Sequence, residues 1–387
     1  MDRVPGFEPG GWRFEPSSVQ ILILSCLLFV NKFAILSHSY VSFSEEIFRR
    51  LGKGRRQAGT LYSQLLRKGK LDRTDPVFRN AQELLDEILD LTGLDLPELL
   101  DCRQDGNTGK FLLRTPDELE IESVLIPMQS GSTLCVSSQV GCRMGCAFCE
   151  TGRMGLLRNL SVEEIVSQIY MARVNLGAAV RNIVFMGMGE PFDNYDNVMG
   201  AVRILTDPLG FGYGKKHISV STSGCVDGIE RLMDDKGDTP NLAVSINAPT
   251  DELRNRLMPI NRTHNLQQLH QAMDAYCRKT RRQILIAYIL LQGVNDTLEH
   301  ADQLAAYLRG LDVKINIIPY NPQSRSRFVA SEDVVMEEFT KRLREHGYYT
   351  LLRATKGQRI MAACGQLGNL KLRQKNQTFR VKNAESV

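Results

Sequence analysis

The 387-residue sequence predicts an α/β fold, an open, partial (β/α)6 barrel preceded by a small N-terminal helical domain. From Leu134 onward, short apolar runs alternate with helical patterns at a steady spacing, which is typical of a parallel sheet buried on both faces. Six such units are present, fewer than a closed eight-stranded barrel needs. We therefore expect a curved, open barrel whose chemistry lies at the carboxyl ends of the strands.

The predicted strands and helices follow one another in strict alternation. The strands are expected at 134–137, 182–188, 217–222, 242–247, 283–291 and 313–320. The helices between them are expected near 161–176, 194–206, 226–235, 265–279 and 296–309. Ser161 stands at the N-cap position of the first helix, and Glu163 and Glu164 lie in its opening turn.

The rest of the chain divides into further segments. Residues 1–43 are expected to be a disordered or mis-assigned extension, with the native chain starting near Val41, and the apolar run at 21–30 is too short to span a bilayer. Residues 44–104 predict a helical accessory domain, with a helical pattern up to about Cys102 and a second helix ending near Gly93. Residues 105–370 form the core, which opens with two strands at 110–114 and 120–126, and 371–387 form a basic tail.

Composition limits the compartment and the partners. The net charge of +4 says little by itself, but lysines and arginines cluster in the helical domain and in the tail. Such clusters are either simply solvated or bind nucleic-acid phosphates. The nine cysteines, an odd number in a long chain, exclude a secreted disulfide framework and indicate a reducing cytoplasm. No membrane partner is expected.

A cysteine run follows the first strand of the predicted barrel. Cys142, Cys146 and Cys149 form a Cys-x3-Cys-x2-Cys pattern, and closely spaced thiolates of this kind hold iron–sulfur clusters. A structural zinc site would need a fourth ligand, but no histidine lies between Thr133 and Val180. Ordinary buried thiols are the other alternative. Three ligands without a fourth favour a four-iron cluster that leaves one iron open to a small molecule.

Polar residues follow several predicted strands. The second strand runs into Gly-Met-Gly-Glu-Pro at 187–191, where the two glycines can let a ligand approach the backbone closely and Glu190 can accept a hydrogen bond from a cationic amine. The third strand ends in Ser-Thr-Ser-Gly at 221–224, and the fourth ends in Ser-Ile-Asn at 245–247. The sixth ends beside Asn321. Each of these alone is more often a turn or a cap than a contact. Because the carboxyl ends of parallel strands lie on one face, their repetition predicts a ligand site with room for a ribose, a carboxylate and an adenine edge.

A lone cysteine, Cys364, stands among small residues in Ala-Ala-Cys-Gly-Gln-Leu near the C-terminus. A catalytic thiol needs access and a means of ionisation, and small neighbours provide access. A buried, inert cysteine is an equally good interpretation of the residues alone.

These motifs, in this order, resemble the RlmN/Cfr family of radical-SAM RNA adenosine methyltransferases. The resemblance covers about residues 105–370 and is specific, since Thr-Leu-Cys-Val-Ser-Ser-Gln-Val-Gly-Cys at 133–142 is close to a family fingerprint. It implies a radical-SAM barrel, a [4Fe-4S] cluster on Cys142, Cys146 and Cys149, and two equivalents of S-adenosylmethionine per turnover. It also implies that the 44–104 domain binds RNA, although there the similarity is loose.

The resemblance assigns roles to further residues. It implies that Cys364 is methylated and carries the methyl group to the base, and that Cys135 helps to release the product, with a Cys135–Cys364 disulfide as the result. Glu122 matches the family's proposed proton acceptor, and Cys135 is the alternative. The S-adenosylmethionine site would be lined by the following residues: Gly189, Glu190, Ser221, Ser245, Ile246, Asn247 and Asn321.

The implied reaction is methylation of carbon 2 of an adenosine in ribosomal RNA, with transfer RNA as a second substrate, by a cytoplasmic monomer that takes electrons from a donor such as flavodoxin. Carbon-8 methylation of 23S ribosomal RNA is the alternative within the family. A radical-SAM enzyme for a small molecule or a protein, and a plain electron carrier, are the other classes. Three features depart from the family pattern and concern the target base and carbon. Many members have His at the position of Asn247 and a carboxylate at the position of Ala287, and the third departure is the form of 150–155.

Overall fold

A computed structural model describes residues 32–235, 239–323, 326–354 and 357–368. The predictions for residues 1–31, including the apolar run, and for the tail from 369 onward lie outside the described residues. Within the described ranges, every helix is too short or too polar to span a membrane.

One ten-stranded sheet organises the core, in the order β14-β13-β12-β11-β10-β9-β6-β5-β4-β3. Its parallel strands are β6 (Ser132–Cys135), β9 (Val180–Phe185), β10 (Ile218–Thr222), β11 (Asn241–Ser245), β12 (Ile284–Leu290), β13 (Val313–Pro319) and β14 (Thr350–Leu352). Its antiparallel edge consists of β3 (Glu98–Asp105), β4 (Thr108–Arg114) and β5 (Glu120–Pro127). The six predicted strands and the predicted fold class are confirmed, and β14 is an addition.

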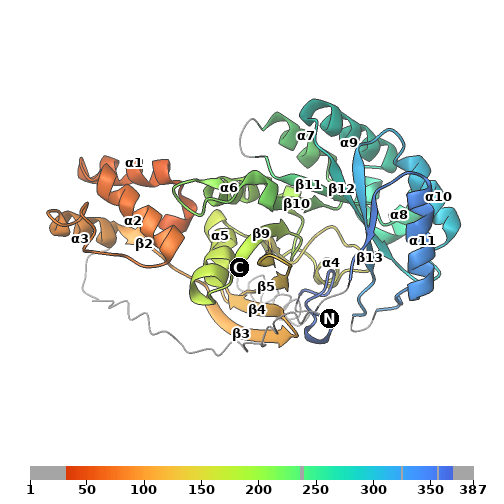
Figure 1. Cartoon of the computed structure of the whole chain (residues 1–387), viewed down its shortest axis with the longest axis horizontal. Helices are drawn as coiled ribbons and strands as arrows, with labels where there is room; N and C mark the ends of the chain where they lie inside the picture. The colour runs from red at the N-terminus through yellow and green to blue at the C-terminus, as the bar shows by residue number, and fades with distance from the viewer. Residues whose placement is uncertain (1–31, 236–238, 324–325, 355–356, 369–387) are drawn as a thin grey trace, which may run out of the picture. The chain divides into compact units, whose positions relative to one another are not determined.

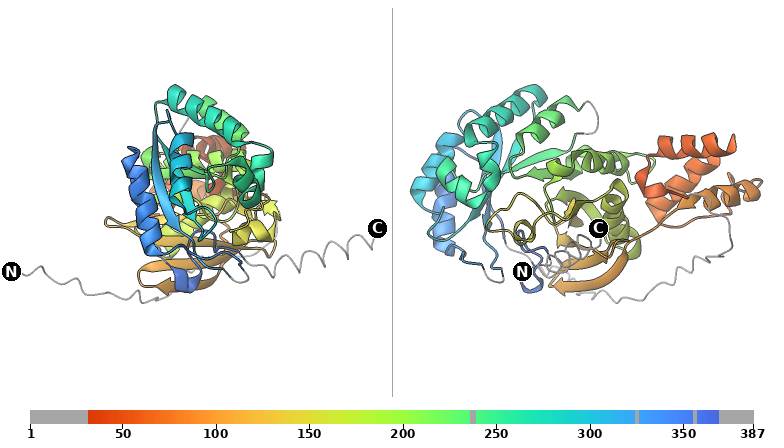
Figure 2. Two further views of the ribbon diagram at one scale, coloured as in Figure 1. Left: turned by 90° about the vertical axis from the view of Figure 1, so that its right-hand side faces the viewer. Right: turned by 180° about the vertical axis from the view of Figure 1, so that it is seen from behind.

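Helices cover the outer face of the curved parallel sheet (Figures 1 and 2). They are α5 (Val162–Tyr170), α6 (Tyr195–Thr206), α7 (Val226–Asp234), α9 (Leu266–Thr280), α10 (Leu298–Tyr307) and α11 (Asp333–Glu345). The short helix α8 (Asp251–Leu257) lies at the strand ends, where Arg254 donates to Ser223 O and Ser245 O. A π-helical turn, Met171–Asn175, extends α5, and short 3-10 turns lie at Ile35–Ser37, Pro191–Asn194, Lys215–His217, Pro259–Arg262 and Gln358–Ile360. Ser161 caps α5 as predicted, because its hydroxyl accepts from Glu164 N and the Glu164 carboxylate accepts from Ser161 N. The helices α8 and α11, and the short helix α4 (Glu150–Met154), were not predicted from the sequence.

The parallel strands are buried on both faces, as their apolar runs predict. In β12, for example, Ile284, Ile286 and Tyr288 are fully buried, and Ala287 on the opposite side is 9% exposed. A strand of this kind offers polar groups only at its ends. The functional polar residues are therefore confined to the edge where the strands end.

The N-terminal helices are α1 (Tyr40–Leu51), α2 (Arg55–Lys68) and α3 (Gln82–Leu91), with a short parallel pair of β1 (Phe33–Ala34) and β2 (Thr92–Gly93). The predicted boundary at residue 43 is too late, because Ile35, Leu36 and Phe43 are fully buried. The prediction of helix up to about Cys102 is also wrong, since the chain from Glu98 is strand β3 of the main sheet. Asp207 in the loop after α6 accepts a hydrogen bond from Tyr40 N at 2.6 Å and so links this helical part to the core.

Candidate active site

The cysteine run lies in a long loop between β6 and α5. The loop is shaped by an antiparallel pair, β7 (Gln139–Val140) with β8 (Arg158–Asn159), and by one short helix, α4 (Glu150–Met154). Gly141 has a φ of 78°, and a Cβ there would lie 1.8 Å from the carbonyl oxygen of Gly155. Only glycine fits this closure of the loop. The fold therefore forces the three thiols onto one compact turn.

Cys142, Cys146 and Cys149 line a single cavity of about 150 Å³, which we call the cysteine-loop cavity. Burial raises the pKa of all three thiols, so the protein alone does not favour three thiolates there. Bound iron would supply the positive charge that stabilises them. Among the described residues no group of three His, Cys, Asp or Glu side chains could hold a single metal ion. The donor set that the three cysteines offer to this one cavity is all sulfur, which fits an iron–sulfur cluster.

The ends of the neighbouring strands form the other walls of this cavity. Gly189 and Glu190 follow β9, Ser221 lies in β10, Ser245 ends β11 and Asn247 follows it. Five of the seven predicted cofactor residues therefore gather at one site. Gly187 and Gly189 were expected to admit a ligand. Instead, a Cβ at Gly187 would lie 2.6 Å from Val136 O, and one at Gly189 would lie 2.6 Å from the Gln139 side chain. The chain itself requires these two glycines.

Glu190 is almost fully buried at the floor of the cysteine-loop cavity. Its Oε2 accepts from both the backbone N–H and the hydroxyl of Ser223 at 2.7 Å, and its Oε1 accepts from Phe192 N at 3.2 Å. Burial raises the pKa of this carboxyl, and the Ser223 hydrogen bonds oppose the rise. Glu190 was expected to accept from a cationic amine, and that role stays a prediction.

Three further predicted cofactor positions differ in placement. Asn247 has a left-handed φ of 56°, and its Oδ1 accepts from Ile289 N at 2.8 Å. Ile246 is fully buried and does not line the cavity, although its carbonyl lies at the strand end. Asn321 lines a second cavity instead, where its amide donates to Cys364 O at 3.4 Å.

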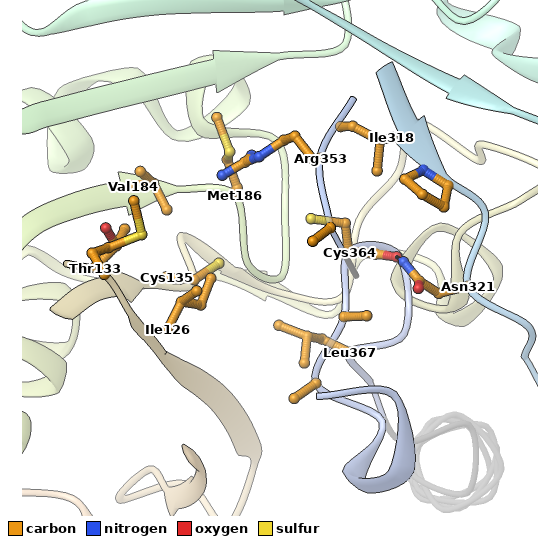
Figure 3. A pocket seen from close by; sticks show the side chains of 15 residues that line it. Ile126, Thr133, Cys135, Val184, Met186, Ile318, Asn321, Arg353, Cys364 and Leu367 are labelled. Atoms are coloured by element: carbon orange, nitrogen blue, oxygen red, sulfur yellow. Dashed lines mark hydrogen bonds between the residues drawn. The ribbon is translucent and has the colours of Figure 1, made fainter. Parts of the chain in front are cut away.

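The second cavity, of about 320 Å³, lies between β6 and the C-terminal segment 357–368 (Figure 3). We call it the two-thiol cavity, because Cys135 and Cys364 lie on facing walls with Ile126, Val184 and Leu367 around them. A cavity of this size and apolar lining can hold a flat heterocycle such as a nucleobase. Three residues line both cavities: Met186, Ile318 and Cys364.

The two thiols differ in environment. Cys135 is 6% exposed, and burial, with a further contribution from Cys364, raises the pKa of its thiol. Cys364 is exposed, so of the two interpretations left open by its small neighbours, the buried, inert cysteine is wrong. Both are described as free thiols, so the disulfide between them stays a prediction.

Glu122 does not line either cavity within the described residues. Its carboxylate forms an ion pair with Lys110 at 2.9 Å and accepts from Gly368 N at 2.8 Å, while Lys110 donates to Met361 O at 3.2 Å. The pair thus holds both ends of the segment that carries Cys364. Its predicted role as proton acceptor stays untested by this geometry.

The Cys364 segment is also joined directly to the cysteine loop. Glu150 N donates to Gly365 O at 2.8 Å, and the hydroxyl of Thr151 donates to Leu367 O at 2.5 Å. The amide of Gln323, which is 8% exposed, donates to Gly365 O at 2.8 Å and to Phe148 O. One buried side chain therefore bridges the loop of the three cysteines and the residue after Cys364.

Three residues of this region were not predicted from the sequence: Arg254, Gln323 and Arg353. Gln323 lies in a connection with no periodic pattern. Arg353 follows β14, which was not predicted, and its side chain lines the two-thiol cavity and reaches toward Met186 (Figure 3). Arg254 lies on α8, also unpredicted, and is fully buried. No local motif distinguishes these residues from ordinary polar positions.

This barrel, with three clustered cysteines before its first helix and a cavity at the strand ends, defines the radical-SAM class. Residues 136–305 match the Radical SAM superfamily. The chain is also similar to the crystal structure of a radical SAM methyltransferase from Sphaerobacter thermophilus, with 37% identity, a TM-score of 0.80, and 86% of this chain and 98% of that chain covered.

Curated relatives narrow the class further. The chain is 58% identical over 342 residues to a probable dual-specificity RNA methyltransferase RlmN 1 of Protochlamydia amoebophila, covering 88% of this chain and 96% of that protein. It is 42% identical over 318 residues to a dual-specificity RNA methyltransferase RlmN of Geotalea uraniireducens, covering 82% and 91%. The chain belongs to the RlmN/Cfr family and is an S-adenosylmethionine-dependent RNA methyltransferase. The family implies S-adenosylmethionine and a [4Fe-4S] cluster as cofactors.

Proposed function

We propose that the enzyme methylates carbon 2 of an adenosine in ribosomal RNA through a methylated Cys364. The observation that carries this proposal is that Cys364 lines both cavities, one beside the three cysteines and one with room for a base. A thiol at the boundary can receive a methyl group on one side and deliver it on the other. The relatives are named dual-specificity RNA methyltransferases, and we propose transfer RNA as the second substrate.

Cys142, Cys146 and Cys149 would hold the cluster, and Gly189, Glu190, Ser221, Ser245 and Asn247 would line the S-adenosylmethionine site. When bound, the cluster and two equivalents of S-adenosylmethionine supply the methyl group and the one-electron cleavage that activates it. Ile246 contributes to this site only through its backbone, because its side chain is fully buried. Asn321 acts on the Cys364 side, through its hydrogen bond to Cys364 O.

Cys135 then releases the product. Its sulfur bonds to that of Cys364 as the bond from Cys364 to the methyl-derived carbon breaks. The electron pair of the broken bond stays on that carbon, which takes up the proton given up by the Cys135 thiol and so becomes the methyl group of the product. The facing positions of the two thiols support this role. Cys135 lines the two-thiol cavity and Glu122 does not, which favours Cys135 as the proton acceptor and Glu122 as a residue that positions the Cys364 segment.

The RNA must present an unpaired or extruded adenine to reach this cavity. Arg353 lies at its wall, and its guanidinium has no hydrogen-bond or ion-pair partner among the described residues, so we assign it to the backbone phosphate of that nucleotide. Many basic residues of the helical domain are already in ion pairs, for example Arg55 with Glu45 and Lys53 with Glu87. Arg56, Lys68 and Lys70 are exposed and form no ion pair within the described residues, which makes them the better candidates for RNA phosphates.

The remaining expectations belong to the same proposal. We propose that the enzyme works as a monomer in the cytoplasm and takes its electrons from a low-potential donor such as flavodoxin. The monomeric state and the electron donor are expected from the family. The cytoplasmic location is expected from the family and from the free thiols.

Mass spectrometry of digested RNA tests the proposal. The loaded enzyme is expected to produce 2-methyladenosine, and Cys364→Ala is expected to lower this product at least about a thousandfold, because the residue that carries the methyl group is gone. The same variant should still cleave S-adenosylmethionine to 5′-deoxyadenosine. A product of 8-methyladenosine establishes the carbon-8 alternative, and methylation retained by Cys364→Ala contradicts the route through this cysteine.

A further inference from the structure

Arg254, on the short helix α8, is the largest fully buried side chain in the described part of the chain. Its guanidinium donates only to neutral groups. The partners are Ile246 O at 3.2 Å, Asn261 Oδ1 at 2.9 Å, Ser223 O at 2.6 Å and Ser245 O at 3.2 Å. These carbonyls come from the ends of β10 and β11, so Arg254 lies directly beneath the edge where the ligand residues gather.

The buried charge of Arg254 has no direct counter-ion. No carboxylate among the described residues forms an ion pair with it. Two carboxylates reach Arg254 only through another residue: Asp251 through Asn261, and Glu190 through Ser223. A guanidinium does not shed its proton at neutral pH, so burial without a counter-charge is costly. The described chain thus leaves a positive charge uncompensated at the base of the site.

The cysteine loop packs against the same helix. Ala147 N donates to Leu257 O at 2.9 Å, and Phe148 shares an apolar cluster with Leu253 and Leu257 of α8. Cys146 packs against this cluster. Arg254 donates to the carbonyl oxygens of Ser223 and Ser245, and both of these residues line the cysteine-loop cavity together with Cys146. The guanidinium of Arg254 therefore lies one backbone group away from the cavity that the three cysteines line.

We propose that Arg254 is the fixed counter-charge of the iron–sulfur cluster, a positioning residue that makes reduction of the cluster more favourable. A four-iron core with two positive charges and three thiolates carries one net negative charge, and one electron from a low-potential donor makes it two. A nearby fixed cation stabilises the more negative state more strongly. Arg254 does not line either cavity, so it acts on the electrostatics and not by touching substrate. This inference rests on the cluster in the proposed function.

The experiment is an anaerobic redox titration of the cluster-loaded variants with dithionite, followed by visible absorbance and electron paramagnetic resonance. Arg254→Gln removes the charge and is expected to make reduction at least about tenfold less favourable, a midpoint potential lower by about 59 mV. Arg254→Lys keeps the charge but loses part of the hydrogen bonding, and its potential should stay close to wild type even if the protein is less stable. Arg256→Gln is the matched control, because it removes an exposed charge from the same helix.

A second pair of variants covers the case in which Arg254→Gln does not fold. Asn261→Asp leaves Arg254 in place and adds a negative charge at the acceptor of its Nη1. Asn261→Ala removes the same amide donation to Asp251 and Asn255 without adding charge. The inference predicts a lower potential for Asn261→Asp than for Asn261→Ala.

The role of Arg254 is overturned if wild type and Arg254→Gln, both with full clusters, have equal midpoint potentials. It is also overturned if Asn261→Asp and Asn261→Ala have equal midpoint potentials. If wild type binds no four-iron cluster, the cofactor assignment fails as well, and iron and sulfide analysis reports this separately. If wild type holds its cluster and shifts as predicted but RNA is not methylated at carbon 2, only the assignment of the reaction fails.

Discussion

The cysteine-loop cavity and the two-thiol cavity share three wall residues but are held in different ways. Backbone hydrogen bonds between the cysteine loop and its neighbours form the first, such as Gly187 N to Val136 O at 3.0 Å and Ser138 N to Met188 O at 2.8 Å. The second depends on a C-terminal segment that joins no strand. Side chains such as Glu122 and Gln323 fix that segment.

The two halves of the site are therefore sensitive to different substitutions. The position of the three cysteines follows from the sheet and from glycines that allow close approach, so it is part of the fold. The position of Cys364 depends on a few long-range side-chain contacts, so changes outside the sheet can displace it. Substitutions should therefore separate cofactor chemistry from methyl transfer.

The largest expected effect comes from breaking the cysteine-loop cavity. Cys146→Ser removes a thiolate ligand and should lower both the cleavage of S-adenosylmethionine and the methylation of RNA at least about a thousandfold, because both need the cluster. Cys364→Ala, by contrast, should affect only methylation. Iron content, 5′-deoxyadenosine and methylated nucleoside are measured together. Cys277→Ser, a partly buried thiol on α9, is the control, and a Cys146→Ser protein that still cleaves S-adenosylmethionine contradicts the assignment.

Removing the second thiol of the two-thiol cavity should arrest the reaction after the methyl group has reached the base. Cys135→Ala leaves the bond between Cys364 and the RNA without the thiol that resolves it, so a protein–RNA adduct should accumulate. Denaturing gels with labelled RNA show this as a shifted band that disappears on RNase treatment. The double variant Cys135→Ala with Cys364→Ala should give no such band. A clean gel for the single variant argues against a release role for Cys135.

The sequence predicted the parallel barrel and the cysteine loop because both depend on local patterns. Apolar strands of four to nine residues and capped helices are short-range signals, and the closely spaced Cys142, Cys146 and Cys149 need only one loop to meet. By contrast, the short helix α8 and the late strand β14 carry little periodicity, so no local pattern marks Arg254 and Arg353 as site residues.

The long-range part of the site was predictable only through family resemblance. More than two hundred residues separate Cys135 from Cys364, and no spacing rule joins them. The bridge from Gln323 to Phe148 O and Gly365 O is of the same kind, because it depends on tertiary packing of a connection without regular structure. Glu122, whose role as proton acceptor also comes from the resemblance, has its contacts in the structure with the backbone of Gly368 and with Lys110.

An intermediate effect is expected from the bridge between the two cavities. Gln323→Leu removes the donor that the buried carbonyl oxygens of Phe148 and Gly365 share. The cost in free energy is about 1–3 kcal/mol, which corresponds to roughly a tenfold to hundredfold lower rate of methylation if it falls on the transfer step. Methylation should fall while iron content stays unchanged, so that more 5′-deoxyadenosine forms for each methyl group transferred. Gln267→Leu, at an exposed position on α9, is the control. An unchanged ratio of the two products shows that Gln323 does not couple the cavities.

The smallest effect distinguishes the two thiols within one cavity. Alkylation requires the thiolate, and burial raises the pKa of Cys135, so at pH 7 iodoacetamide should modify the exposed Cys364 at least about tenfold faster. Between pH 7 and pH 9 the Cys135 thiolate fraction rises about tenfold per unit, since the pH stays below its raised pKa, and the rate at Cys135 should follow. Peptide mass spectrometry on reduced protein with an unmethylated Cys364 measures both rates, with Cys135→Ala as the control for Cys364. Equal rates at pH 7 would mean that Cys135 is as accessible and as ionised as Cys364, and the division into a carrier thiol and a shielded release thiol would then be wrong.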